Sequence, residues 1–179
     1  MNWHWFISTK IFYGKDVLRE NAHSFKTLGD KALIITGQGG SPRRNGSLDD
    51  TIWALESVGL GWEVFAEVEA NPSITTVRRG AATAKEKDAD FIIGIGGGSP
   101  LDAAKAIAIL AVEDIDDEDL FALKFTESLP IVAVPTTAGT GSEVTPYSII
   151  THPEMGGKMR IMGDKLLPYL AFLDPKYTL

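Results

Sequence analysis

Residues 91–105 constrain the fold more than any other part of the chain, because they combine a strand, a glycine-rich turn and a helix without a break. Residues 91–95 are a continuous apolar run, which is typical of a strand covered on both faces in a parallel sheet. Three glycines follow at 96–98, and Ser99-Pro100 then predicts a helix start, with serine as N-cap. Glycines let backbone amides approach a ligand, and the helix directs its positive end there. This segment therefore predicts a phosphate-binding turn.

Strand-like and helix-like stretches alternate along the chain. The strand-like stretches are 31–36, 62–68, 91–95 and 131–134, and the helix-like ones are 47–58, 73–87 and 99–112. This alternation predicts an α/β fold with a mostly parallel sheet and helices on both faces, a Rossmann-like nucleotide-binding domain. At 179 residues the chain is too short for two ordinary domains, so we expect a single dinucleotide-binding domain over 1–179.

Composition narrows the classes of partner. The formal net charge of −7 argues against nucleic acids and anionic membranes, since the long-range field repels polyanions. The chain contains no cysteine, which excludes disulfides and thiolate chemistry. No apolar run approaches the ~18 residues of a membrane span, and nothing resembles a secretory signal. We therefore expect a soluble, cytoplasmic protein.

The two ends differ from the alternating core. An extended segment over about residues 1–14 carries Trp3, Trp5 and Phe6, which could add a strand to a second copy and form a homodimer, or pack on the domain's own sheet. Residues 145–173 contain short strand candidates separated by glycine and proline. The chain stops at Leu179 without a tail, so we expect it to be part of a longer protein.

Three loops that follow predicted strands are rich in glycine and hydroxyl side chains: 36–46, 96–99 and 136–143. Ligands of open parallel sheets bind beyond the carboxyl ends of the strands, so the three loops together predict a nucleotide cleft. None matches the usual dinucleotide fingerprint, because Gly94 and Gly96 are followed by Ser99 where the last glycine belongs.

Each of these features has a simpler structural explanation. The glycine run could serve only as a tight turn, and the loop hydroxyls could satisfy loop backbones. Asp102 could complete a capping box with Ser99 instead of contacting a ligand. The acidic stretch at 113–119 is expected to be a solvated surface turn and not a metal site.

Two segments closely resemble the iron-containing (group III) alcohol dehydrogenases: Gly-Gly-Gly-Ser-Pro-Leu-Asp-Ala-Ala-Lys at 96–105, and Pro-Thr-Thr-Ala-Gly-Thr-Gly-Ser-Glu-Val-Thr at 135–145. The resemblance extends through Asn71-Pro72 and 172–175, so it covers nearly the whole chain as the amino-terminal, cofactor-binding half of that family. It implies hydride transfer between a small alcohol or aldehyde and a nicotinamide dinucleotide.

The resemblance also implies a second, helical half that supplies one Asp and three His to a divalent metal, usually iron, sometimes zinc. The histidines of this chain are His4, His23 and His152, and none forms an Asp-x-x-x-His pair. We interpret them as surface or structural residues, since a metal site needs three or four ligands. The helical metal-binding domain is thus expected to be absent, and the chain alone to bind cofactor without turnover.

The resemblance implies a set of cofactor-binding residues in the loops and beyond. The pyrophosphate is expected to bind the backbone amides of residues 97–99. The threonines of the 136–143 loop are expected to lie along the nicotinamide. The candidates are Gly37, Gly39, Gly40, Ser41, Asn71, Gly97, Gly98, Ser99, Asp102, Thr136, Thr137, Thr140, Ser142, Ile149, Lys158 and Tyr177.

The first loop predicts NADP in preference to NAD. A carboxylate there would bind a free 2′-hydroxyl and repel a 2′-phosphate, and residues 36–46 contain none. Arg43 and Arg44 could supply positive charge to the phosphate, or could simply be solvated.

Two other functions remain open from the residues. A glycerol or polyol dehydrogenase, or a relative of dehydroquinate synthase, would share the three loops, although the 136–143 stretch favours the alcohol dehydrogenase branch. The other is a non-catalytic binding or assembly module that uses its apolar amino-terminal segment.

Overall fold

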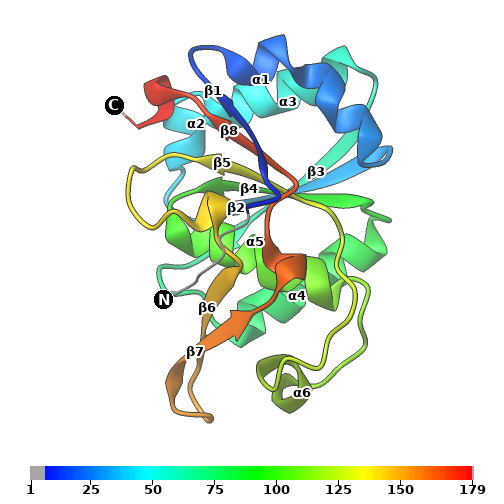
Figure 1. The fold of residues 1–179 in the computed structure, drawn as a ribbon, viewed down its shortest axis with the longest axis vertical. Coiled ribbons are helices and arrows are strands. Elements are labelled where there is room, and N and C mark those ends of the chain that lie inside the picture. Colours follow the sequence, from blue (N-terminus) through cyan, green and yellow to red (C-terminus); the bar gives the residue numbers. More distant parts are fainter. Residues whose placement is uncertain (1–6, 179) are drawn as a thin grey trace, which may run out of the picture.

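The computed structural model describes residues 7–178, and they build one six-stranded parallel sheet with helices on both faces (Figure 1). The strand order is β1-β8-β5-β4-β2-β3, and every neighbouring pair runs parallel. The strands are β1 (Lys10–Tyr13), β2 (Lys31–Gly37), β3 (Gly61–Val68), β4 (Phe91–Gly96), β5 (Ile131–Pro135) and β8 (Leu170–Leu173). The four strands predicted from the sequence are confirmed to within one residue at either end.

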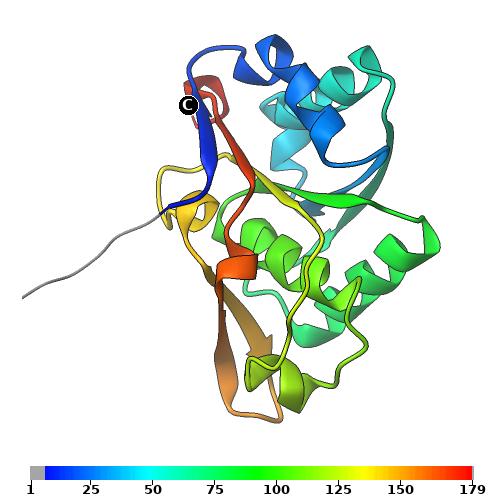
Figure 2. The ribbon, with the colours of Figure 1, turned by 45° about the vertical axis from the view of Figure 1, so that its right-hand side comes forward.

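The helices form two layers, one on each side of the sheet, which Figure 2 shows from the side. The upper layer contains α1 (Val17–Glu20), the 3-10 helix η1 (Ala22–Thr27), α2 (Ser41–Arg44) and α3 (Ser47–Ser57). The lower layer contains α4 (Ile74–Glu86) and α5 (Gly98–Leu110), with the short α6 (Asp117–Phe121) beyond them. The predicted α/β class is therefore confirmed.

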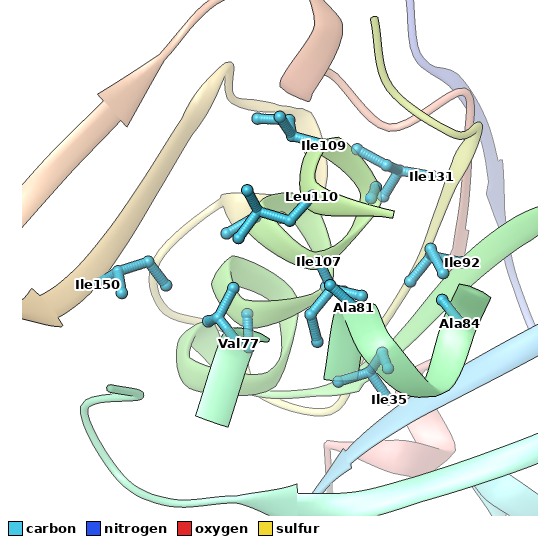
Figure 3. Packing of buried hydrophobic residues seen from close by; sticks show 14 of the residues in the cluster. Ile35, Val77, Ala81, Ala84, Ile92, Ile107, Ile109, Leu110, Ile131 and Ile150 are labelled. Atoms are coloured by element: carbon cyan, nitrogen blue, oxygen red, sulfur yellow. The ribbon is translucent and has the colours of Figure 1, made fainter. Parts of the chain in front are cut away.

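Alternation along the central strands divides the core between these layers. In β2, Leu33 and Ile35 belong to the cluster between the sheet and helices α4 and α5, whereas Ala32 and Ile34 belong to the cluster between the sheet and helices η1 and α3. Successive side chains of a strand point to opposite faces, so a strand buried on both faces must be apolar throughout. Figure 3 shows the lower cluster, in which Ile107 of α5 lies beside Ala81 of α4.

Helix α5 packs directly against Gly94 of β4, where there is no room for a side chain. A Cβ on Gly94 would stand 2.9 Å from the Cβ of Ala104 and 3.1 Å from Leu101 Cδ2. Real side chains do not approach so closely, so this glycine sets the depth at which α5 packs. The beginning of α5 is thereby held against the carboxyl end of β4.

A two-stranded antiparallel hairpin projects from the main body. It consists of β6 (Tyr147–His152) and β7 (Gly157–Met162) and lies beside α5 and α4 (Figure 1). Thr151 donates its N–H to the carbonyl of Pro72 at 2.7 Å, which ties the hairpin to the loop after β3. The sequence predicted short strands in this region but not their pairing.

Three further 3-10 turns are η2 (Ser142–Val144), η3 (Asp164–Leu166) and η4 (Pro175–Tyr177).

The amino-terminal segment enters the sheet at its edge, where β1 pairs with β8 alone. Phe12 of β1 stacks on Phe172 of β8 with ring centroids 5.0 Å apart, and Phe25 of η1 stacks on the same ring at 5.2 Å. Trp3, Trp5 and Phe6 lie outside the described residues, so pairing of two copies through them stays a prediction. Within residues 7–178, no helix has the length and apolar character needed to cross a membrane.

The acidic stretch at 113–119 is more than the solvated turn expected from its charge. Asp116 caps α6 by accepting from the N–H of Asp119, and Asp117 pairs with Arg78 of α4. His152 also contacts Asp117, with its Nε2 3.0 Å from Oδ2. Charge patterning alone could not show these partners, because they lie on other elements.

Candidate functional site: a cleft over the start of helix α5

Two hollows meet at the carboxyl ends of β2, β3 and β4. The first, about 540 Å³, lies between the loops after β2 and β3 and the turn that opens α5. The second, about 300 Å³, lies between the same turn, the loop after β3 and the β6–β7 hairpin. Gly98 and Ser99 line both hollows, so we treat them as one cleft that passes over the start of α5.

The turn before α5 leaves the first amides of the helix without a side-chain cap. The helix begins at Gly98 with Gly97 as N-cap, not at Ser99 as the sequence predicted. The serine hydroxyl instead accepts from the N–H of Asn71, at 3.3 Å, on the loop after β3. The first N–H groups of a helix have no partner within it and favour an anion. This 13-residue helix thus offers donors and a positive dipole end to the cleft.

The glycines of this turn are required by the third loop, which folds over them. A Cβ on Gly98 would stand 2.8 Å from Thr140 Cγ2, and one on Gly97 would stand 3.3 Å from Thr137 Oγ1. Gly96 has a φ of 144°, a conformation that side chains rarely adopt. The turn is therefore a cradle that any side chain would fill.

Asp102 connects α5 to the opposite wall. Its Oδ1 accepts from Ser142 Oγ at 2.7 Å, and its Oδ2 accepts from the N–H of Ile149 at 2.9 Å. Burial raises the pKa of Asp102, although both of these hydrogen bonds act in the opposite direction. The capping box considered for this residue does not form. Asp102 lines the second hollow and holds the hairpin in place.

Lys158 supplies a positive charge on the far side of the second hollow. It lies on β7 opposite Thr151 of β6, and both residues line the hollow together with Ile149. The hydroxyl of Thr151 donates to the carbonyl of Asn71 at 3.2 Å. The hairpin and the loop after β3 thus form one continuous wall of the second hollow, and the N–H of Asn71 joins this wall to Ser99.

The first loop, residues 36–46, borders the first hollow. Gly37 and Gly39 line it directly, whereas Gly40, with a φ of 67°, and Ser41 lead into α2. Arg44 folds back and donates to the carbonyl of Gly39 at 2.6 Å, so its guanidinium lies beside the loop.

The remaining candidates lie around or below the cleft. Thr140 lines the second hollow, and Thr137 lines a separate hollow of about 270 Å³ near Glu143. Thr136 donates its N–H to the carbonyl of Gly96 at 2.9 Å. Ser142 is buried and reaches the cleft only through Asp102.

Tyr177 does not line the cleft. Its side chain is 2% exposed, and its hydroxyl donates to Asp50 Oδ2 at 2.8 Å. Burial is the main reason that its pKa is raised, and the bond to Asp50 adds to it. Its carbonyl accepts from Asn45, just after α2, so it supports the first loop from beneath. The resemblance placed it at the cofactor, whereas the structure assigns it to the core.

Sequence reasoning missed part of the wall, because it named Gln38 only as part of the first loop and took only Asn71 from the loop after β3. Gln38, Glu69 and Ala70 line the first hollow, and Thr151 lines the second. Glu69 Oε1 accepts from the N–H of Ser73 at 2.8 Å and thereby supports the start of α4. The available signal was the loop position itself, since Glu69 directly follows the strand predicted at 62–68.

The described residues contain no three His, Cys, Asp or Glu side chains placed to hold a metal ion. His152 is buried beside Asp117, and His23 is exposed on η1. His4 lies outside the described residues.

This chain is similar to one family of proteins over most of its length. The family described as "Iron-containing alcohol dehydrogenase" matches residues 8–175. NADH-dependent butanol dehydrogenase A of Clostridium acetobutylicum is 36% identical over 174 residues, which is 96% of this chain and 44% of that protein. The 1,3-propanediol dehydrogenase of Klebsiella pneumoniae is 36% identical over 170 residues, 92% of this chain and 43% of that protein.

Solved structures show the same likeness. An iron-containing alcohol dehydrogenase from Thermotoga maritima superimposes with a TM-score of 0.91 and 44% identity, over 99% of this chain and 49% of that one. The chain therefore spans about half the length of the relatives it matches. Its sequence and its fold both place this protein in the iron-containing alcohol dehydrogenase family.

Proposed function

We propose that this chain binds a nicotinamide dinucleotide across the cleft and supplies the cofactor half of an enzyme that interconverts small alcohols and aldehydes. One observation carries the proposal: two hollows share the uncapped start of α5, which offers amides to a diphosphate between them. A dinucleotide has this form, with a nucleoside on each side of a pyrophosphate. The names of the butanol and propanediol dehydrogenases among its relatives support the class of substrate.

Each wall would have a distinct part in binding. The amides of Gly98 and Ser99 would donate to the pyrophosphate, and Lys158 would offset its charge from across the cleft. Thr137 and Thr140 close over the turn and would exclude water on the nicotinamide side. When bound, the nicotinamide supplies the carbon that accepts or donates the hydride. We assign no step to a metal, because the described residues offer no ligand cluster.

We further propose that the first loop favours NADP over NAD. Residues 36–46 hold no carboxylate, and Arg44 lies against the Gly39 carbonyl at the rim of the first hollow. Two relatives are named as NADH-dependent butanol dehydrogenases, so this preference would set the chain apart from them. Among the described residues that line the first hollow, Glu69 is the one carboxylate, and its Oε1 accepts from the N–H of Ser73 at the start of α4.

Titration of the 179-residue chain with NADPH and with NADH tests both proposals. We expect NADPH to bind at least about tenfold more tightly, which corresponds to one ion pair of about 1.4 kcal/mol. Arg44→Gln should weaken NADPH binding and leave NADH binding unchanged, and the surface change Lys124→Gln should alter neither. Equal affinities would refute the preference for NADP. No binding of either dinucleotide would refute the function itself.

A further inference from the structure

Lys105 is a buried cation that the proposed cofactor contacts do not use. It lies in the middle of α5 and is 1% exposed. Its Nζ donates to the carbonyls of Thr145 and Tyr147, both at 2.7 Å. A lysine charge is seldom buried unless hydrogen bonds compensate it, because removing an ion from water costs several kcal/mol. These two bonds therefore hold residues 145–147 against α5 at a considerable desolvation cost.

The same face of α5 holds the hairpin at a second point. Asp102 and Lys105 are three residues apart, so their side chains lie on one side of the helix. Asp102 accepts from the N–H of Ile149, and its carbonyl accepts from Ser148 Oγ at 2.7 Å. Asp102 and Lys105 thus hold residues 147–149 of β6 against α5.

This attachment determines where one wall of the cleft stands. Ile149 of β6 lines the second hollow, and Thr151 is paired with Lys158 across the hairpin. A shift of β6 along α5 would move the Lys158 ammonium relative to the amides of Gly98 and Ser99. Hydrogen bonds and ion pairs weaken steeply with such displacements.

We propose that Lys105 is a positioning residue for the dinucleotide: it touches no part of the cleft, yet it holds the hairpin at the position from which Lys158 reaches the phosphates. This inference rests on the proposed function. Lys105 acts on the phosphates through Lys158, so its effect on binding should vanish when the charge of Lys158 is removed.

The buried position also makes the attachment sensitive to pH. Burial lowers the pKa of Lys105 to about 8, against the opposing charges of Asp102 on α5 and Glu143 on η2. A neutral amine keeps two N–H donors, but it loses the charge that strengthens both bonds. Dinucleotide affinity should therefore fall as the pH rises from 7 to 9.5 through the pKa of Lys105.

The test is a double-mutant cycle on the 179-residue chain, with NADPH affinity measured by fluorescence titration. Lys105→Met keeps the unbranched stem and removes the donors, and Lys158→Gln removes the charge in the cleft. Lys124→Met is the matched control, because Lys124 is 65% exposed and pairs with Asp119 on α6. Circular dichroism of each variant reports folding, and each affinity is measured at pH 7 and pH 9.5.

We expect Lys105→Met to weaken binding about tenfold at pH 7 and to change little in the Lys158→Gln background. The wild type should lose affinity about threefold at pH 9.5, and Lys105→Met should show no such loss. Lys124→Met should match the wild type throughout.

Several results would overturn the inference. One is a Lys105→Met variant that binds NADPH as tightly as the wild type. Another is a double variant whose loss of affinity equals the product of the losses in the two single variants. If Lys105→Met does not fold, the wild-type pH series decides, and a constant affinity between pH 7 and 9.5 would refute it. A wild type that binds no dinucleotide at pH 7 would instead overturn the proposed function, and this inference with it.

Discussion

Replacing Gly98 with alanine is the most direct test of the cradle. The new methyl group would stand 2.8 Å from Thr140 Cγ2 and 3.2 Å from its Oγ1. Carbon atoms in contact normally lie about 3.5–4.0 Å apart, so Thr140 or the helix must yield by about 1 Å. Either movement changes the cleft, because Thr140 lines the second hollow and the helix carries the amides that we assign to the pyrophosphate.

The expected effect is large on binding and small on stability. Overpacking costs about 1–3 kcal/mol, and alanine offsets about 1 kcal/mol of this through its better helix propensity, which leaves about 0–2 kcal/mol. The loss of one charge-assisted hydrogen bond costs about 1.5–3 kcal/mol, or roughly 10- to 150-fold in affinity. Calorimetric titration with NADPH measures the loss of affinity, and thermal unfolding measures the loss of stability.

Gly80→Ala is the matched control. Its methyl group would stand 2.4 Å from Ile107 Cδ1, between α4 and α5 and away from the lining of either hollow. It should lower the melting temperature by up to about 8 °C, from about 2 kcal/mol at about 2–4 °C each, and leave NADPH affinity unchanged. The reasoning fails if Gly98→Ala is folded and binds within twofold of wild type, or if Gly80→Ala weakens binding as much.

Two predictions concern the ion network beneath the first loop, where Lys176 Nζ contacts Asp16 Oδ1 at 2.5 Å and Asp50 Oδ2 at 2.8 Å. A hydrogen bond from Lys176 is the main cause that lowers the pKa of Asp16, and hydrogen bonds from Lys176, Arg19 and Tyr177 lower that of Asp50 despite its burial. Such carboxylates stabilise the fold above their ordinary pKa and cease to do so as the pH falls through the lowered pKa. Through the loss of its bond to Asp50, Lys176→Met should cost about 1–3 kcal/mol at pH 7, and almost nothing once the pH lies below the lowered pKa of Asp50, as measured by urea unfolding. Tyr177→Phe should cost about 1–3 kcal/mol and leave NADPH affinity within twofold of wild type; a tenfold loss of affinity without loss of stability would return Tyr177 to the cofactor site.

The sequence by itself determined the architecture and indicated the turn at 96–99 as the centre of the candidate site. Runs such as 91–95 must be buried on both faces, because their side chains are apolar in both directions of the pleat. Glycines between a buried strand and a helix leave few alternatives to a phosphate-binding turn. These are local signals, readable from adjacent residues, and the structure confirms the strands and the fold class.

Only the tertiary structure decided how the walls of the cleft meet. The strand order places the loop after β3 beside the first loop, and so brings Glu69 to the rim. The tertiary structure also places the start of α5 at Gly98 and not at Ser99. The hydroxyl of Ser99 accepts from the N–H of Asn71 and does not cap the helix. The hydroxyl of Tyr177 donates to Asp50, and the ammonium of Lys105 donates to the carbonyls of Thr145 and Tyr147. Each of these outcomes depends on a partner 28 to 127 residues away in the chain, which no local pattern can reveal.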